Sequence, residues 1–425
     1  MKRIIAEILL MFSGIAFLQA QNTIQFSNIN FFQNEKFQLF PTVYVENGLF
    51  TFNKPKKIDT IIDLRGKYII PPFAEGHTHK LDMPQDVDSE SQSFLSQGVF
   101  YALVLNNFSS HVDTNRLRFN RREMPDVLYA NGGITVSGQH PSFAYERILS
   151  GIKDWWTPEN TKKIQTARKG ENDAYWFMNN PGEVDMKWNA YIKTKPDLVK
   201  VYLLNSRLGD STNNSLSEAS LQRIMQKAQE NNLRVVAHIE TANDLKMALH
   251  DGIKLFSHMP YYNVNYLKEI PAPLDFSKQE LAMIKKLEPV IIPTLSFNEE
   301  FSIVRTEKNN YLGEMDTASF QRALKFQKNF LEQLSDAGFR FAIGSDRDSL
   351  ISELRYWLRY QMFAPERIMT IATKDTPMLL FPKRKISELK EGYEASFLVL
   401  EKNPLNHFEF LQAIVFRIKQ GKILQ

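Results

Sequence analysis

The residues of this chain that could support metal chemistry begin with a His-x-His triplet, His77 and His79, at the end of a short apolar run. In an extended strand, side chains two positions apart point to the same face, so both imidazoles can reach one point. Imidazole is a common ligand of zinc and other divalent transition metals. Since the chain has 8 histidines in 425 residues, the triplet alone leaves metal binding open.

Other candidate ligands occupy similar positions later in the chain. His238 and His258 each end a short apolar run, Asp346 follows another, and Lys200 interrupts a fourth. Taken singly, each has an ordinary explanation: a satisfied polar residue at a strand end, a lysine that extends to solvent from an edge strand, or a helix N-cap at Asp346. Their joint occurrence at the ends of different runs favours metal chemistry.

The elements that must position these residues form an alternating pattern. Short apolar runs recur at 69–70, 99–104, 127–130, 198–204, 234–237, 254–256, 290–295 and 339–343. Helical patterns lie between several of them, at 217–231, 241–251, 277–287, 318–337 and 352–372. This alternation predicts an α/β fold with a parallel sheet, and eight strands predict a (β/α)8 TIM-like barrel. An open, doubly wound sheet stays an alternative. The active site of a barrel lies where its strands end, which is where the candidate ligands fall.

The two ends of the chain differ from its middle. Residues 21–70 and 386–425 contain short alternating runs separated by turn residues, as in antiparallel sheets. We expect one small β-sandwich domain built from both termini, with the barrel over residues 71–385. Residues 132–197 are too many for one loop and helix, so they predict an insertion near the barrel mouth. Its four tryptophans either pack there or line a pocket.

The first 20 residues read as a secretory signal peptide, with Lys2 and Arg3 ahead of an apolar stretch and a small-residue cleavage site at Ala20. The alternative is an uncleaved anchor, although the stretch is shorter than the roughly 20 residues that span a bilayer. We therefore expect an exported protein, periplasmic or extracellular, with no membrane span after cleavage. No later segment is long and apolar enough to suggest a second span. The chain has 0 cysteines, which excludes disulfides and thiolate metal ligands.

The overall charge is small and mixed. The chain has 52 Lys and Arg residues against 48 Asp and Glu residues, a formal net charge of +4. So small an excess does not indicate a nucleic-acid or anionic-membrane partner. We expect a small-molecule substrate, and we leave the formation of a homo-oligomer open.

The order His-x-His, Lys, His, His, Asp resembles that of the amidohydrolase superfamily, over nearly the whole mature chain. The branch it is most similar to contains imidazolonepropionase-like and prolidase-like enzymes. The supporting segments are Lys-Val-Tyr at 200–202, Val-Ala-His-Ile-Glu at 236–240, Ile-Gly-Ser-Asp at 343–346 and the tail 389–405. The chain departs from many relatives at Glu75, Pro72, Ser396 and Arg347. These departures bear on the substrate more than on the ligand set.

The resemblance implies a site for two divalent metal ions, most often zinc. His77 and His79 would hold one ion with Asp346, and His238 and His258 would hold the other. Lys200 would bridge them as a carbamate, since an ammonium group cannot be a ligand. A simpler alternative is an unmodified Lys200 beside a single metal ion.

The resemblance also implies the reaction. A metal-bound hydroxide would attack the carbonyl of an amide, such as a dipeptide or a cyclic amide. Asp346 would accept its proton and deliver it to the leaving nitrogen. Two alternatives stay open: a lactone or phosphoester hydrolase that uses the same site, and a non-catalytic binding protein on the same barrel.

Three residues are candidates for substrate binding. His140 falls where prolidase-like relatives carry a substrate-contacting histidine, and it could instead be an ordinary loop residue. Tyr202 shares a strand face with Lys200 and either reaches the substrate or packs. Arg347 could bind a carboxylate group with two hydrogen bonds.

Overall fold

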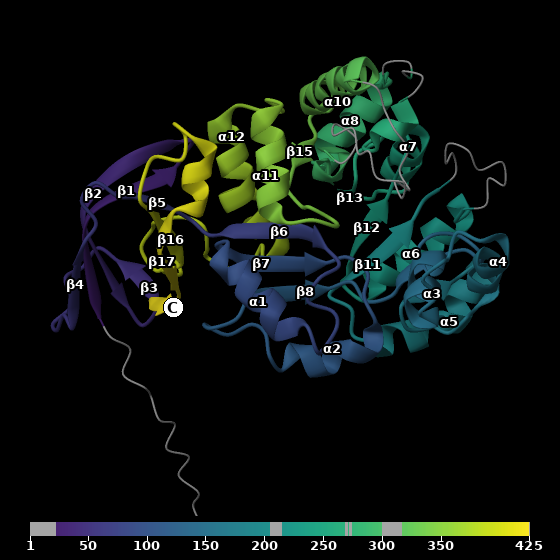
Figure 1. Ribbon diagram of the computed structural model, residues 1–425, viewed down its shortest axis with the longest axis horizontal. Helices are drawn as coiled ribbons and strands as arrows, with labels where there is room; N and C mark the ends of the chain where they lie inside the picture. Colours follow the sequence, from purple (N-terminus) through teal and green to yellow (C-terminus); the bar gives the residue numbers. More distant parts are fainter. Residues whose placement is uncertain (1–22, 205–214, 268–270, 272–273, 300–316, 425) are drawn as a thin grey trace, which may run out of the picture.

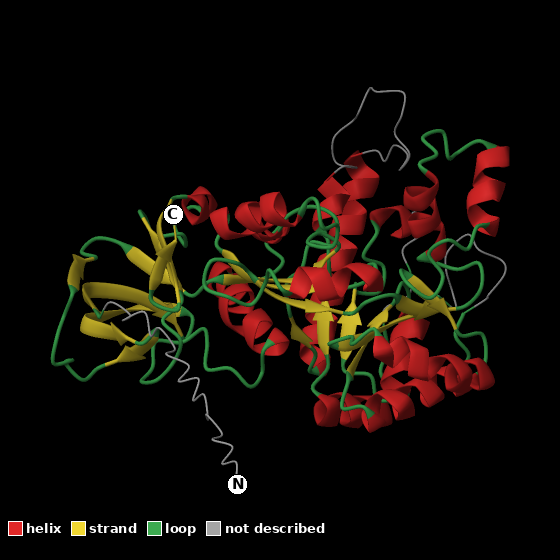
Figure 2. Cartoon of the chain, turned by 90° about the horizontal axis from the view of Figure 1, so that it is seen from below, coloured by secondary structure: helices red, strands yellow, loops and turns green. Residues whose placement is uncertain are grey.

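The computed structural model describes residues 23–204, 215–267, 271, 274–299 and 317–424. The expected signal peptide, residues 1–20, lies outside the described residues. The chain forms a barrel of parallel strands with helices around it, and a smaller sheet packs at one side (Figures 1 and 2). Of the helices in the described ranges, none combines the length and apolar character needed to cross a membrane.

The barrel confirms the predicted (β/α)8 fold. Its strands are β6 (Phe73–Thr78), β7 (Val99–Val104), β8 (Asp126–Tyr129), β9 (Gly133–Thr135), β11 (Leu198–Tyr202), β12 (Arg234–His238), β13 (Leu255–Ser257), β14 (Val290–Ile292) and β15 (Arg340–Phe341). The third strand is split, because β8 pairs with β7 whereas β9 pairs with β11. The side chains of β6, β7 and β11 are buried along their whole length, as expected for parallel strands covered on both faces.

The barrel closes where the segment after β15 meets β6. Gly76 N–H donates to Ile343 O at 2.9 Å, and Asp346 N–H donates to His77 O at 2.7 Å. Glycine is needed on both sides of this seam. A Cβ on Gly76 would lie 2.7 Å from Ile343 O, and a Cβ on Gly344 would lie 2.6 Å from His77 N. The close approach of these two backbones therefore sets the position of His77 relative to Asp346.

Helices surround the strands. They are α1 (Val87–Ser96), α2 (Ser109–Arg116), α3 (Ser142–Ser150), α4 (Pro158–Thr166), α5 (Pro181–Lys193), α6 (Glu218–Glu230), α7 (Ala242–His250), α8 (Lys278–Leu287), α10 (Thr317–Ala337), α11 (Leu350–Arg359), α12 (Pro365–Thr370) and α13 (Thr376–Leu380). Short 3-10 helices are η1 (Val264–Leu267), η2 (Ser296–Asn298) and η4 (Phe408–Gln412), and η3 (Ile371–Asp375) is a π-helical segment between α12 and α13. Thr241 and Ser277 each begin a helix with a capping box. The single helix expected over 352–372 is wrong, because the chain breaks after Arg359 and a new helix starts at Pro365.

The small domain contains strands from both ends of the chain. They are β1 (Ile24–Gln33), β2 (Lys36–Glu46), β3 (Leu49–Thr51), β4 (Thr60–Asp63), β5 (Tyr68–Ile70), β16 (Phe397–Leu400), β17 (Ile414–Lys419) and β18 (Lys422–Leu424). They pair in the order β18-β17-β16-β5-β1-β2-β3, with β4 beside β1. The sheet folds back on itself: Ala395 N–H donates to Gly48 O, and the rings of Phe50 and Phe397 stack at 5.7 Å.

The prediction that the apolar run 69–70 is the first barrel strand is wrong. Ile69 and Ile70 belong to β5 of the small domain, and the first barrel strand is the next segment, β6. The predicted insertion 132–197 begins with the barrel strand β9 and continues with α3, α4, β10 (Tyr175–Phe177) and α5. Of its tryptophans, Trp176 and Trp188 are buried against Tyr191, whereas Trp156 is 64% exposed.

Buried ion pairs join the small sheet to the barrel. The Lys419 side chain is 0% exposed, and its ammonium group donates to Asp126 Oδ1 (2.7 Å) and Arg121 O (2.9 Å). Arg384 donates to the other oxygen of Asp126 at 2.7 Å. Burial lowers the pKa of Lys419, and the Asp126 carboxylate opposes that shift.

We expect Lys419→Met to reduce the free energy of unfolding by about 3 kcal/mol, because it leaves the Asp126 carboxylate buried with one of its two cations missing. Equilibrium unfolding in urea measures the change. The matched control is Lys422→Met, whose half-exposed pair with Glu123 should contribute roughly 0.5 kcal/mol or less. Equal effects of the two substitutions would contradict the importance of the buried pair.

Candidate metal centre

The carboxyl ends of the barrel strands bring the predicted ligands together. His77 lies near the end of β6, Lys200 lies within β11 and His238 ends β12. His258 directly follows β13, and Asp346 lies beyond β15, paired with Thr78 next to His77. Their backbones are thus fixed by the sheet rather than by long loops.

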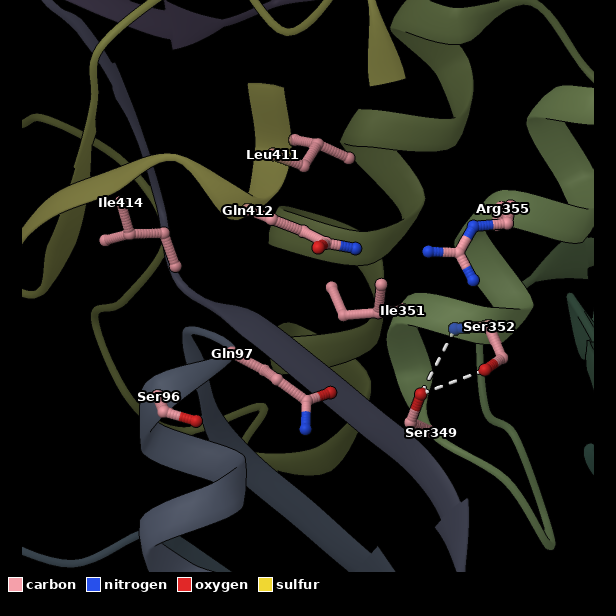
Figure 3. A pocket seen from close by; sticks show the side chains of 9 residues that line it. All are labelled: Ser96, Gln97, Ser349, Ile351, Ser352, Arg355, Leu411, Gln412 and Ile414. Carbon is pink, nitrogen blue, oxygen red and sulfur yellow. Dashed lines mark hydrogen bonds between the residues drawn. The ribbon is translucent and has the colours of Figure 1, made fainter. Parts of the chain in front are cut away.

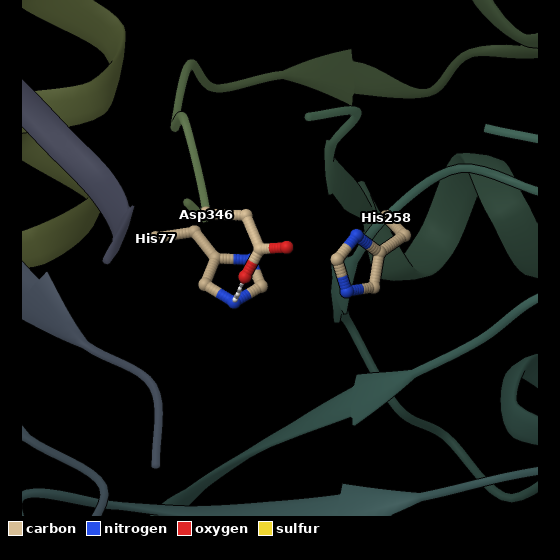
Figure 4. A group of neighbouring side chains, drawn as sticks. All are labelled: His77, His258 and Asp346. Carbon is tan, nitrogen blue, oxygen red and sulfur yellow. Dashed lines mark ion pairs between the residues drawn. The ribbon is translucent and has the colours of Figure 1, made fainter. Parts of the chain in front are cut away.

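Three of these side chains form a group that could hold a metal ion. One potential ligand atom from each of His77, His258 and Asp346 lies within 4.8 Å of the others (Figure 4). His77 and His258 are buried, and the ring centroids of these two histidines are 4.9 Å apart. Asp346 is 16% exposed, so it faces both the histidines and the solvent side.

His79 joins this group through Asp346. The Nδ1 atom of His79 lies 3.1 Å from the backbone oxygen of Asn106. A carbonyl oxygen only accepts, so His79 Nδ1 donates to it. The Nε2 atom of His79 faces Asp346 Oδ1 at 3.0 Å, and His77 Nε2 lies 3.2 Å from the same oxygen. Either a proton or a cation between nitrogen and oxygen satisfies these contacts.

The donor set therefore fits a divalent metal ion. Imidazole nitrogens and a carboxylate oxygen are the ligands that zinc prefers when no thiolate is present. His77 Nδ1 is buried and has no hydrogen-bond partner among the described residues. Such an orphaned nitrogen is costly in a purely structural core and is consistent with a ring retained to bind a ligand.

The electrostatics keep the ligands in their binding forms. Burial, with the positive potential of Lys200 and neighbouring histidines, lowers the pKa of His77 well below its usual value. Burial and His238 do the same for the pKa of His258. Burial alone would raise the pKa of Asp346, but the hydrogen bond and charge of His79 hold it well below its ordinary range. Neutral imidazoles and an ionised carboxylate are the species that coordinate metals.

Lys200 lies inside the barrel, next to the histidines. Its side chain is 1% exposed, its nitrogen contacts the hydroxyl of Ser257, and it lies 5.3 Å from the centroid of the Tyr202 ring. Burial lowers the pKa of Lys200 to about 7, against the opposing charge of Asp346. A substantial share of its amine is therefore neutral near pH 7.

His238 is adjacent to the three-residue group and lies outside it. Its ring centroid is 4.5 Å from that of His258, and its Nε2 atom lies 3.4 Å from Glu240 Oε1. The resemblance divides the ligands into a His77, His79 and Asp346 set and a His238 and His258 set. In the structure His258, expected in the second set, lies with His77 and Asp346 of the first set. The two expected ligand sets are therefore adjacent, and the structure does not separate them.

The candidate substrate residues are placed differently from one another. The ring of His140 lies 5.3 Å from that of His238 and 5.1 Å from that of Tyr202. Tyr202 is 3% exposed, and its hydroxyl donates to Asn106 Oδ1 at 3.2 Å. Arg347 is exposed, and its backbone N–H donates to Ser345 O. The structure brings His140 and Tyr202 to the histidines and leaves the Arg347 side chain at the surface.

Further residues that the sequence analysis did not predict as ligands or substrate-binding residues also support the site. Tyr262 stacks on the ring of His258 at 4.2 Å. Glu75 accepts hydrogen bonds from Ser345 N and Ser345 Oγ across the barrel seam, at 2.8 and 2.7 Å, and burial raises the pKa of Glu75 to about 7. Asn106 and Thr294 contact ligand histidines. Both follow barrel strands, so the strand-end criterion that selected the ligands could also have selected them.

A separate cavity lies outside the barrel. It has a volume of about 370 Å³ and lies between α1, α11 and the segment from η4 to β17 (Figure 3). Its polar lining includes Gln97, Arg355 and Gln412, and none of the predicted ligands borders it. The cavity therefore belongs to the junction between the barrel and the small sheet, not to the metal centre.

Comparisons with known proteins bear on the family and the fold of the chain. The family model described as "Amidohydrolase family" matches residues 70–424. Ochratoxinase from Aspergillus niger is 24% identical over 217 residues. That match covers 49% of this chain and 42% of ochratoxinase, so the aligned part is less than half of the relative's length.

Solved structures show the same fold over nearly the whole chain. The A. niger ochratoxinase structure superposes with a TM-score of 0.69 at 16% identity, and the match covers 95% of each chain. A Xaa-Pro dipeptidase with methionine bound in its active site gives a TM-score of 0.70 at 15% identity, covering 95% of this chain and 100% of the dipeptidase. At sequence identities of 16% and 15%, these two matches show a shared fold and do not identify the substrate of this chain.

Proposed function

This chain belongs to the amidohydrolase family, and from that premise we propose that it is an exported, metal-dependent hydrolase that cleaves an amide C–N bond. The observation that carries the proposal is the group of His77, His258 and Asp346 at the carboxyl edge of the barrel. His79 extends it, since its Nε2 atom lies 3.0 Å from Asp346 Oδ1.

The ligand set would hold one or two divalent ions, with zinc the best match to imidazole and carboxylate donors. His77, His258 and Asp346 form the three-residue group, and His79 contacts it through Asp346. His238 and Lys200 lie beside it. When bound, such an ion would activate water and polarise a substrate carbonyl. Lys200 can join the set as a carbamate, because the burial that brings its pKa to about 7 makes a neutral amine available to react with carbon dioxide.

Asp346 is the residue placed to move the proton. It is ionised, since its pKa is held low, and its partial exposure lets it reach both the histidines and an incoming substrate. A carboxylate in this position can accept the proton of the attacking water at an oxygen. It can then deliver the proton to the nitrogen that leaves when the C–N bond breaks.

The substrate would bind against the rings next to the ligands. His140 and Tyr202 border His238, and Tyr262 covers His258. These rings offer apolar faces with a few polar atoms, as is usual for small-molecule sites. Dipeptides and cyclic amides fit this description. Export is supported by the sequence of residues 1–20.

The test combines elemental analysis with a substrate panel. We expect purified protein to contain one or two zinc ions per chain and to hydrolyse at least one of three amide classes: Xaa-Pro dipeptides, other dipeptides and cyclic amides. Removal of metal by a chelator should abolish the activity, and added zinc should restore it. Activity confined to lactones or phosphoesters would contradict amide hydrolysis, and protein that binds no metal under any loading condition would contradict the metal centre.

A further inference from the structure

Thr294 follows β14 and lies directly behind His258, inside the barrel mouth. Its side chain is 0% exposed. Its backbone has a φ of +56°, in the left-handed region that β-branched residues rarely adopt because their Cβ substituents crowd the backbone. Glycine or asparagine would adopt this conformation more easily. A threonine held there points to a role for its hydroxyl group.

The hydrogen bonds of Thr294 define the protonation of His258. The Thr294 hydroxyl donates to the backbone oxygen of Pro293 at 2.7 Å. A hydroxyl has one hydrogen, so toward His258 Nδ1, 2.6 Å away, it must accept. His258 Nδ1 therefore carries the proton, and the lone pair of the neutral ring is on Nε2.

We propose that Thr294 is a positioning residue that fixes the Nδ1–H tautomer of His258 and so prepares Nε2 to hold the metal ion. Among the described residues, the hydrogen bonds of the Thr294 hydroxyl join it to His258 and Pro293, so it acts through His258. The inference rests on the proposed function for the presence of a metal ion. It adds a reason why Nε2 of His258, and not Nδ1, would bind the metal ion. The hydrogen-bond partner of one ring nitrogen decides which nitrogen is left to coordinate, and here that partner is Thr294.

A second contact restrains the same ring in a different way. Tyr262 stacks on His258 with an interplanar angle of 21°, so it limits the tilt of the imidazole. Thr294 determines which nitrogen is protonated. His79 has an equivalent arrangement, since its Nδ1 atom donates to the carbonyl of Asn106, another residue with positive φ, +98°. In both cases a strand-end residue in an unusual backbone conformation presents an acceptor to Nδ1.

The test compares Thr294→Val with Thr294→Ser in the full chain. Valine keeps the branched shape but removes the acceptor, whereas serine keeps the hydroxyl and removes only a methyl group. The readout is the zinc dissociation constant, measured by competition with a chromophoric chelator, together with the thermal unfolding midpoint of the metal-free protein. We expect Thr294→Val to weaken zinc binding about 10- to 100-fold and Thr294→Ser to stay within about threefold of the wild type.

The metal-free midpoint separates a positioning role from a structural one. Each substitution has its own cost without metal: Thr294→Val leaves the buried His258 Nδ1–H without an acceptor, and Thr294→Ser removes one buried methyl group. Zinc affinity is therefore compared well below both midpoints, where each metal-free variant is folded. Equal zinc affinity in Thr294→Val and wild type would overturn the inference while leaving the proposed function intact. A wild-type chain that binds no zinc would overturn both. If Thr294→Val does not fold, Thr294→Ala, which also lacks the hydroxyl, makes the same comparison with Thr294→Ser.

Discussion

Replacing Asp346 with asparagine is expected to reduce kcat about 10³-fold on whichever amide the enzyme cleaves, while the protein still binds metal. The substitution preserves the size of the side chain and removes the charge that accepts a proton, and general acid–base catalysis typically accounts for 10²- to 10⁴-fold in rate. Metal should be retained in part, because His77 and His258 remain and the amide oxygen can face His77 Nε2, now 3.2 Å from the carboxylate.

The measurement is steady-state kinetics beside elemental analysis of the same Asp346→Asn preparation. Asp348→Asn is the matched control: it lies two residues away, and its carboxylate is 3.5 Å from Ser296 Oγ instead of contacting the histidines. We expect that control to keep its activity within about threefold, as for a substitution outside the chemistry. An Asp346→Asn variant with more than a tenth of wild-type kcat would rule out Asp346 as the main proton carrier.

Replacing Lys200 with methionine is expected to remove at least one metal ion per chain and to reduce activity about 10³-fold or more. Methionine fills the buried space of the lysine stem, yet it can form no carbamate and offers no comparable ligand for zinc. Because the Lys200 amine becomes mostly neutral above its pKa of about 7, that pH range favours carbamate formation. Reconstitution of metal-free wild type with zinc should therefore be efficient near pH 8 with bicarbonate and poor near pH 6.

Metal content, intact mass and bicarbonate dependence test this expectation together. A carbamate adds the mass of carbon dioxide to the wild type, and the addition should be absent from Lys200→Met. Lys187→Met is the control, since Lys187 is partly exposed and bonds to Glu183 and to a backbone oxygen in the insertion. Full metal content and activity in Lys200→Met would show that Lys200 is not required at the metal centre.

The sequence predicted which polar side chains meet at the barrel mouth, because barrel strands end at one edge and a polar residue that ends an apolar run is conspicuous there. His238 and His258 were recognisable in this way without any knowledge of distances. The sequence did not show which of these side chains would form one group. That grouping depends on the closure of the barrel at Gly76 and Gly344, where close backbone contact places His77 next to Asp346.

Other features could not be inferred from residue types. Ile69 and Ile70 were assigned to the barrel because a short apolar run has the same appearance in a parallel and an antiparallel strand. The break after Arg359 was overlooked although Pro365 disfavours helix in the residue before it. The positive φ of Thr294 is set by tertiary contacts, since threonine has no local preference for that conformation.

The sheet shared by the two ends of the chain has a consequence for biosynthesis. β5 ends at Ile70, and its neighbour β16 begins only at Phe397. The edge of β5 stays without this neighbour until the C-terminal segment is available to fold, which in an exported chain is after translocation. During that interval the edge could pair with another chain. The last part of the chain to be made thus protects the first part from pairing with another molecule.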